Sequence, residues 1–288
     1  MSRRFVLSLG CPDRIGIVAR IATFLAELGG TIVEAAYHAD EDSRWFFTRQ
    51  SVDADSIGMD LDELRRRFGR VAEELGPETD WQIADSAEPK DVVVLASKEG
   101  HCLHDLLGRV EGGDFPARIR AVVGNHENLR AMTEAHGVPF HHVPFPSDPA
   151  ERGPAFEEVA SLVDDIDPRA IVLARFMQVL PQHLCSRWAG RAINIHHSFL
   201  PSFVGARPYH QAHARGVKLI GATCHYVTAD LDQGPIIEQD VIRVNHASTV
   251  QDMVRQGRDA EKLVLARGLR WHLEDRVLVH DARTVVFN

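Results

Sequence analysis

The segment NIHHSFLPSF, residues 194–203, carries the side chains best suited to chemistry, because Asn194 and His196 end a short apolar run. Side chains two positions apart on a strand share a face, and open α/β sheets present their reactive groups at the carboxyl ends of strands. A second segment, DLDQGP at residues 230–235, supplies the carboxylate of Asp232. An amide, an imidazole and a carboxylate together favour attack on a carbonyl-type carbon, since they stabilise an oxyanion and transfer protons.

Motifs for several other chemistries are missing from the sequence. The turn SKEGH, residues 97–101, lacks the glycines that let a backbone approach the pyrophosphate of a dinucleotide. No Walker motif, Gly-x-Ser-x-Gly elbow or His-Glu-x-x-His pattern occurs either. The adjacent pairs His141–His142 and His196–His197 would point to opposite faces of their strands, so we expect no metal site.

Composition narrows the class of protein further. The 32 basic and 41 acidic residues give a net charge of −9, which argues against a nucleic-acid partner. No apolar run approaches the roughly 20 residues that span a bilayer, and the start of the chain, MSRR, lacks the apolar core of a signal peptide. The four scattered cysteines form no Cys-x-x-Cys pair and are expected to be reduced thiols. We therefore expect a cytoplasmic protein without a membrane partner.

The first 85 residues alternate between strand and helix patterns. We predict strands at 4–9, 31–38, 45–52 and 81–83, and helices at 15–28 and 61–75, with Asp13 as a candidate cap of the first helix. The resulting order βαββαβ is the ferredoxin-like arrangement. A small, polar, Pro-containing stretch at 86–90 then reads as a linker to a second domain.

This order and the turn CPDRIGI, residues 11–17, resemble the ACT domain, a small regulatory module of amino-acid and one-carbon enzymes. The resemblance implies a possible amino-acid effector site around Asp13 and Gly16, and assembly into a homo-oligomer through residues 1–85. The alternative, in which Asp13 only caps a helix and the domain only dimerises, stays open.

The second domain, residues 91–288, predicts a Rossmann-like, mostly parallel sheet. Apolar strands alternate with helices, as in βαβ units. The predicted strands are 92–96, 119–123, 140–143, 170–174 and 192–195, with helices at 102–110, 128–136 and 156–166. Partly polar strands at 219–227 and 236–244, a long helix at 250–269 and a terminal hairpin complete the prediction.

Three blocks in order, residues 193–205, GAT-x-H at 221–225 and LD-x-GP at 231–235, resemble the folate-dependent formyltransferase family over residues 90–288. Its signature is Asn-x-His-x-Ser-Leu-Leu-Pro, then a strand histidine, then Asp-x-Gly-Pro. The resemblance implies a catalytic triad of Asn194, His196 and Asp232, with His225 in support. The substrate it implies is 10-formyltetrahydrofolate, with no further cofactor and no metal.

The same resemblance implies a folate pocket made by a strand-loop and a second loop. The implied residues are Leu173, Met177, Gln178, Val179, Leu180, Val227, Thr228, Ala229 and Asp230.

The N-terminal module and the run GARPYHQ, residues 205–211, resemble the branch of the family that transfers the formyl group to water. The chain has EGHC at 99–102 where amine-using members have a Gly-Ser-Asn-type phosphate turn, and it also departs from them at Gln178 and His197. We expect hydrolysis to formate and tetrahydrofolate, feeding purine synthesis and balancing the one-carbon folate pool. His197 and the turn at 98–102 are the candidates for selecting water. Transfer to an amine such as glycinamide ribonucleotide is the alternative, and a ligand sensor without turnover is a third reading.

Overall fold

The computed structural model describes residues 2–202 and 208–288, so the sequence-motif positions Phe203, Gly205, Ala206 and Arg207 lie outside the described residues. Contacts divide the chain into two units. The first holds Met1–Pro89, Glu274–His280 and Val285–Asn288, and the second holds Lys90–Leu273 and Asp281–Thr284. The sequence analysis assigned the whole tail to the second domain, whereas most of residues 274–288 group with the first unit.

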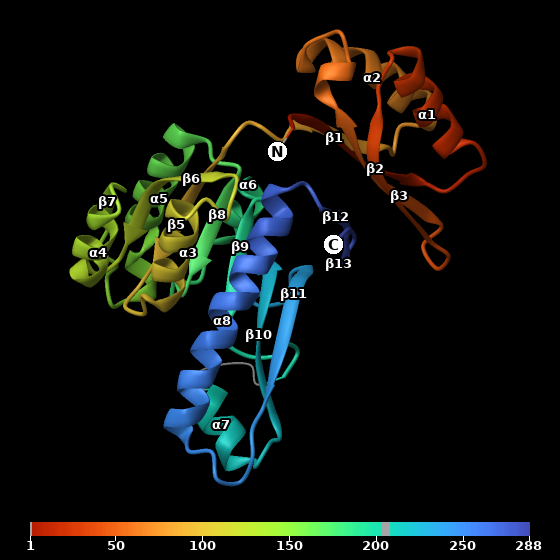
Figure 1. Ribbon diagram of the computed structural model, residues 1–288. Helices are drawn as coiled ribbons and strands as arrows, with labels where there is room; N and C mark the ends of the chain where they lie inside the picture. The colour runs from red at the N-terminus through yellow and green to blue at the C-terminus, as the bar shows by residue number, and fades with distance from the viewer. Residues whose placement is uncertain (1, 203–207) are drawn as a thin grey trace. The chain divides into compact units, whose positions relative to one another are not determined.

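The first unit has the element order βαββαβ around a small antiparallel sheet (Figure 1). The sheet order is β2-β3-β1-β4, and apolar side chains that alternate along β1 form the core with the two helices. The elements are β1 (Arg4–Pro12), α1 (Ile17–Glu27), β2 (Ile32–Asp40), β3 (Trp45–Asp53), η1 (Ala54–Ser56), α2 (Leu61–Leu75) and β4 (Asp80–Asp85).

The turn before α1 differs from its prediction. The helix begins at Ile17 and its N-cap position is Gly16, which has a φ of 99° and offers no side chain. Asp13 is exposed and lies before this position, with its backbone N–H donating to the carbonyl of Arg44. The prediction that Asp13 caps the helix was therefore wrong, because the chain needs a further turn with a left-handed glycine before the helix can start.

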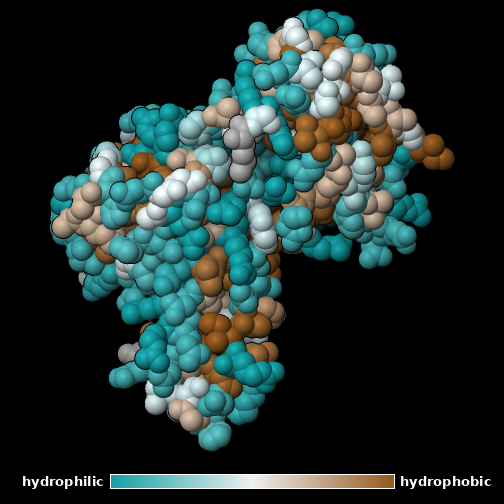
Figure 2. All heavy atoms as spheres, viewed as in Figure 1, coloured by the Kyte–Doolittle hydropathy of each residue, from teal (hydrophilic) through white to brown (hydrophobic). Residues whose placement is uncertain are grey.

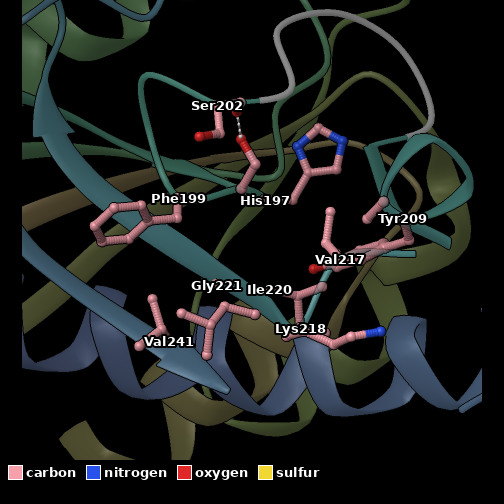
Figure 3. Close-up of a pocket in the computed structure, with 12 residues that line it drawn as sticks. His197, Phe199, Ser202, Tyr209, Val217, Lys218, Ile220, Gly221 and Val241 are labelled. Atoms are coloured by element: carbon pink, nitrogen blue, oxygen red, sulfur yellow. Dashed lines mark hydrogen bonds between the residues drawn. The ribbon is translucent and has the colours of Figure 1, made fainter. Parts of the chain in front are cut away.

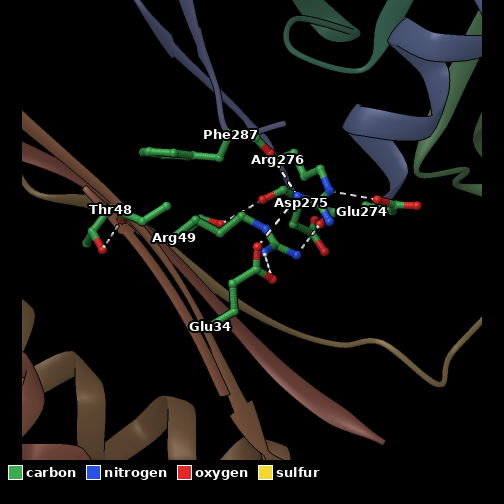
Figure 4. A network of polar contacts seen from close by, with 9 residues as sticks. Glu34, Thr48, Arg49, Glu274, Asp275, Arg276 and Phe287 are labelled. Atoms are coloured by element: carbon green, nitrogen blue, oxygen red, sulfur yellow. Dashed lines mark hydrogen bonds and ion pairs between the residues drawn. The ribbon is translucent and has the colours of Figure 1, made fainter. Parts of the chain in front are cut away.

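The C-terminal segment is held to the small sheet by polar contacts (Figure 4). The buried guanidinium of Arg49 on β3 pairs with Glu34 on β2 at 3.2 Å and also donates to the carbonyl of Glu274. Arg276 pairs with the carboxylate of Glu274 and donates to the carbonyl of Phe287. These bonds explain why the tail belongs to the first unit.

The second unit contains a seven-stranded, mostly parallel sheet of order β11-β10-β9-β8-β5-β6-β7 (Figure 1). Strands β5 to β9 pair in parallel, and β10 and β11 add an antiparallel edge. The elements are β5 (Lys90–Ala96), α3 (His101–Glu111), β6 (Ala117–Gly124), η2 (Glu127–Leu129), α4 (Arg130–Ala135), β7 (Phe140–His142), η3 (Pro149–Glu151), α5 (Gly153–Ile166), β8 (Ala170–Ala174), α6 (Gln182–Arg187), β9 (Ala192–His196), α7 (Pro208–Ala214), β10 (Leu219–Tyr226), β11 (Ile236–Arg243) and α8 (Val250–Leu273). A terminal hairpin, β12 (Val277–His280) and β13 (Arg283–Val286), follows as predicted.

Two short helices escaped the sequence analysis. Helices α6 and α7 have six and seven residues, too few for an apolar repeat to show a helical period. Helix α8 also runs beyond its predicted end, to Leu273. Within the described ranges, no helix is both long and apolar enough to cross a membrane.

Candidate active site

A cavity of about 670 Å³ opens at the carboxyl ends of β5, β8 and β9. Strand β5 lies between β6 and β8, where the strand order reverses, and ligands of α/β sheets bind at such points. The lining residues are Glu99, His101, Arg175, Phe176, Met177, Val179, Asn194, Ile195, His196, His197, Tyr209, His210, Leu231, Asp232, Val254, Arg258 and Glu261.

The β9–β10 ladder orients Asn194. Asn194 pairs directly with His225 across the ladder, and its Nδ2 lies 3.2 Å from the Nε2 of that histidine. The other ring nitrogen of His225 lies 2.8 Å from the carbonyl oxygen of Tyr226, which can only accept. Nδ1 of His225 therefore carries the proton and Nε2 accepts from the Asn194 amide. Burial lowers the pKa of His225 and keeps it neutral in this role. The second amide hydrogen of Asn194 remains for the cavity.

A tight loop brings Asp232 to the same place. The backbone N–H of Tyr226 donates to the carbonyl of Pro235 and closes the loop. Gly234 passes so close to the carbonyl oxygen of Tyr226 that any Cβ there would overlap it. Asp232 itself has a φ of 56°, a left-handed conformation that aspartate adopts more readily than most residues.

Asp232 and His196 form a nearly buried pair. Asp232 Oδ2 lies 3.2 Å from Nδ1 of His196, and Oδ1 lies 3.8 Å from Nε2 of His225. Burial acts to raise the pKa of Asp232, but the hydrogen bond and charge of His196 outweigh it, so the pKa falls below its usual range. Nε2 of His196 is buried and has no hydrogen-bond partner among the described residues, which leaves that nitrogen for a substrate.

These three groups can carry out acyl transfer. The free amide hydrogen of Asn194 and the free nitrogen of His196 can contact a developing oxyanion, and the ionised Asp232 can take a proton from a nucleophile. The sequence analysis named all three, and the structure places them in one cavity.

The opposite end of the cavity holds a second carboxylate, Glu261 of α8, whose side chain is only 1% exposed. Its Oε2 accepts from Nε2 of His101 at 2.8 Å and lies 3.5 Å from Nε of Arg175, while Oε1 accepts from the hydroxyl of Tyr209 at 2.8 Å. Burial acts to raise the pKa of Glu261, but the His101 bond and the Arg175 charge lower it, so the group is ionised.

His197 lies between the two ends of the cavity. Burial, the Arg175 guanidinium and the His196 imidazole together lower the pKa of His197 to about 4. His197 and Tyr209 also line a second, mainly apolar cavity of about 540 Å³, whose other lining residues include Val217 and Ile220 (Figure 3). The imidazole of His197 is therefore neutral at pH 7 and lines both cavities.

Hydrogen bonds from β10 hold the loop that follows β9. The Thr223 hydroxyl donates to the carbonyl of Ser198 and accepts from the backbone N–H of Leu200. The Ser198 hydroxyl in turn donates to the carbonyl of Ser202 (Figure 3). The Ser198 hydroxyl is thus engaged with the backbone of the loop.

Of the predicted folate-binding residues, the structure places two in the cavity wall and the others outside it. Met177 and Val179 line the cavity and are more than half exposed. Leu173 and Leu180 are buried in the core, and the other predicted residues are absent from the cavity wall. Those others are Gln178, which is partly buried, Val227, which packs against the core, and Thr228, Ala229 and Asp230, which are exposed.

One group of possible metal ligands occurs among the described residues, namely His101, Cys102 and Glu261. Burial raises the pKa of the Cys102 thiol, whereas a metal requires the thiolate. Both oxygens of Glu261 already accept hydrogen bonds, and the Arg175 cation lies beside one of them. This donor set suits a hydrogen-bond network better than a cation.

Glu261 was not predicted as a site residue, and Arg175 and Tyr209 entered the sequence analysis only within the strand-loop at 173–180 and the run at 205–211, without a role of their own. Glu261 had a usable signal, since it falls on the buried stripe of α8 with Ala260 and Val264. A charge on an apolar stripe is rare unless it is paired. Arg175 and Tyr209 offered no comparable pattern, because their partners are distant in the sequence.

Comparison with known proteins identifies the family. Residues 90–269 match the family model described as formyl transferase. The chain is 45% identical to a formyltetrahydrofolate deformylase of Corynebacterium sp. (strain P-1), over 98% of both proteins. The chain therefore belongs to the formyl transferase family, in the branch of the formyltetrahydrofolate deformylases.

Solved structures agree with this placement. The chain resembles a formyltetrahydrofolate deformylase from Pseudomonas syringae pv. tomato str. DC3000 with a TM-score of 0.97 and 56% identity, covering 100% of this chain and 95% of that one. A glycinamide ribonucleotide transformylase from Symbiobacterium toebii matches with a TM-score of 0.65 and 27% identity, covering 70% of this chain and 95% of that one. The full-length likeness is thus to the deformylase.

Proposed function

We propose that the chain hydrolyses 10-formyltetrahydrofolate to formate and tetrahydrofolate, with Asn194, His196 and Asp232 as the catalytic residues. The observation that carries the proposal is the contact between the ionised Asp232 and His196 beside the oriented amide of Asn194, within one cavity. The full-length likeness to deformylases supplies the substrate.

The reaction divides among the three groups. Water attacks the formyl carbon while Asp232 accepts its proton, and a carbon–oxygen bond forms. The oxyanion that develops accepts from Asn194 and His196, and one such donor is worth roughly 3 kcal/mol. The carbon–N10 bond then breaks, the electron pair stays on N10, and His196 delivers the proton that makes N10–H. The ionised Asp232 favours the protonated imidazole before the attack, and the proton that Asp232 takes from water passes to His196 after N10 has left.

The test is formate release without any acceptor. Purified protein is mixed with 10-formyltetrahydrofolate, and formate and tetrahydrofolate are measured together. We expect release in equal amounts, lost in Asp232→Asn and kept in Asp259→Asn, which changes an exposed carboxylate of α8 outside the cavity. If no formate appears and an amine such as glycinamide ribonucleotide becomes formylated instead, the chain is a transferase, the activity of the relative that shares part of its fold.

The products suggest a role in metabolism. Formate released here would feed purine synthesis, and tetrahydrofolate would return to the one-carbon pool. Deletion of the gene should then lower the cellular ratio of tetrahydrofolate to 10-formyltetrahydrofolate, and an unchanged ratio would contradict this role.

The first unit is proposed to be an ACT domain with an effector site at Asp13 and Gly16. Its order βαββαβ and its antiparallel sheet support the assignment, and both residues are exposed beside Ile15. Amino acids that raise the melting temperature of the wild type, but not of Asp13→Ala, would support the site. No shift with any amino acid would contradict it.

A homo-oligomer assembled through the same unit is also proposed. Strand β2 is an edge strand, and large apolar side chains such as Val33 and Tyr37 are exposed on it. Figure 2 shows apolar side chains at the surface of this unit. Unpaired edges of this kind commonly pair with another chain. Light scattering should give a multiple of the chain mass, reduced in Val33→Glu.

A further inference from the structure

The backbone of Arg175 is unusual for a residue of its size. It follows the last residue of β8 with a φ of 62°, in the left-handed region that favours glycine. Its charged side chain is only 14% exposed and lines the cavity. Backbone strain at a buried charge persists only when the surrounding structure enforces it, and such strain concentrates at functional sites.

Both oxygens of Glu261, the partner of Arg175, are engaged by other side chains of the cavity. Glu261 accepts from His101 and Tyr209, one at each oxygen, and faces Arg175 as an ion pair. Burial raises the pKa of Tyr209, so its hydroxyl stays protonated and remains a donor. The wall opposite Asp232 therefore has a carboxylate whose two oxygens are already occupied.

We propose that Arg175 and Glu261, held together by Tyr209 and His101, fill the acceptor side of the cavity and restrict the formyl acceptor to water. The inference rests on the proposed hydrolysis. The competing reaction would form a bond from the formyl carbon to an amine nitrogen, break the bond to N10 and pass the amine proton to N10.

Three physical features of this wall act against an amine. An amine carries a substituent that needs volume, and the Arg175 side chain lines the same cavity as His197 and reduces the space there. An amine nitrogen also needs an acceptor for its hydrogens, and the oxygens of Glu261 are engaged. A protonated amine would further meet the Arg175 cation. Water needs only about 30 Å³ and can be bound by Asp232 alone.

The test measures the ratio of formylated amine to formate. Wild type is mixed with 10-formyltetrahydrofolate and excess glycinamide, and we expect formate only. The double variant Arg175→Gly/Glu261→Gln removes the side chain and its charge together, and glycine suits the left-handed backbone. Pocket changes of this kind alter discrimination by roughly ten- to two-hundredfold, so we expect the ratio to rise about tenfold or more.

A second variant covers the chance that the first does not fold. Tyr209→Phe frees one oxygen of Glu261 and should raise the ratio in the same direction, whereas the exposed Arg255→Ala should leave it at the wild-type value. An unchanged ratio in a folded variant that still hydrolyses overturns the proposal. Loss of both reactions in both folded variants also overturns it, because the residues would then serve catalysis itself. Absence of formate from the wild type overturns the proposed hydrolysis instead.

Discussion

The cavity contains two carboxylate–imidazole pairs that differ in what is left free. Asp232 and His196 form one pair, and a ring nitrogen of that histidine is buried without a partner among the described residues. Glu261 and His101 form the other, and both oxygens of that carboxylate accept hydrogen bonds. Nδ1 of His101 is also buried without a hydrogen-bond partner among the described residues, so the pairs differ at the carboxylate, since Asp232 contacts histidines whereas Glu261 contacts His101, Tyr209 and Arg175.

This difference distinguishes the pair that serves catalysis from the pair that serves stability. A buried polar group without a partner costs free energy, so it persists where a substrate supplies the partner. A buried carboxylate that accepts hydrogen bonds from two helices and pairs with a cation holds those elements in place. We therefore expect changes at Asp232 to affect turnover and changes at Glu261 to affect stability.

The largest expected effect is on turnover in Asp232→Asn. The amide keeps the shape but neither accepts the proton of water nor stabilises the His196 imidazolium, and removal of a triad carboxylate lowers kcat by roughly 10³-fold or more. Stopped-time formate release measures the loss. The circular dichroism spectrum should match that of the wild type, and a variant with more than a tenth of wild-type kcat would refute the assignment of Asp232.

Glu261→Gln should show the opposite pattern. The variant leaves Arg175 buried without its counter-ion, and breaking a buried ion pair costs roughly 3 kcal/mol. Urea unfolding should report this loss of stability, while kcat for hydrolysis changes by much less than in Asp232→Asn. Equal stability of variant and wild type would show that the second pair is not the structural one.

Gly234→Ala tests whether the exact position of Asp232 is what makes its pair catalytic. The new Cβ would overlap the carbonyl oxygen of Tyr226, so the loop must shift and carry Asp232 with it. A displacement near 1 Å can cost roughly 10²-fold in rate. Formate release measures the loss, and Gly113→Ala, at a left-handed glycine of another loop, is the control for backbone strain alone. Matching activities of the two variants would show that the loop does not set the geometry.

The two pairs also differ in how far the sequence could predict their residues. The strand pattern places Asn194 and His196 on one face of residues 192–196, and Asp232 was assigned by the resemblance of residues 231–235 to the family motif. The parallel strand at 170–174 is a fully buried apolar run and was predicted to the residue, and the other parallel strands were predicted to within two residues at each end. Those features depend on neighbours in the sequence.

Glu261 and Arg175 depend on partners far away in the chain. Tyr209 and His101 contact Glu261 only when α8 packs on the sheet, so the residues next to Glu261 in the sequence do not reveal these partners. The left-handed backbone of Arg175 has no sequence signal either. The predicted cap at Asp13 failed for the same reason, since the length of the turn before α1 is set by how that helix packs.

The smallest expected effect concerns His197, which faces members of both pairs. Its folded pKa of about 4 lies below the ordinary 6.5, with Arg175 and His196 lowering it and Glu261 and Asp232 opposing them. The unfolded chain therefore binds a proton between pH 6.5 and 4 that the folded chain does not. Stability should fall as pH drops from 7 to 5, by about 2 kcal/mol from this group. The lowered pKa of His225 adds to this loss of stability, whereas the lowered pKa values of Asp232 and Glu261 affect stability only nearer pH 4.

Urea unfolding at both pH values should show a drop in stability that is smaller in His197→Gln than in the wild type, by about 2 kcal/mol. Equal drops in the two proteins would mean that His197 is already protonated in the folded cavity, and the charge balance between the two pairs would have to be reassigned.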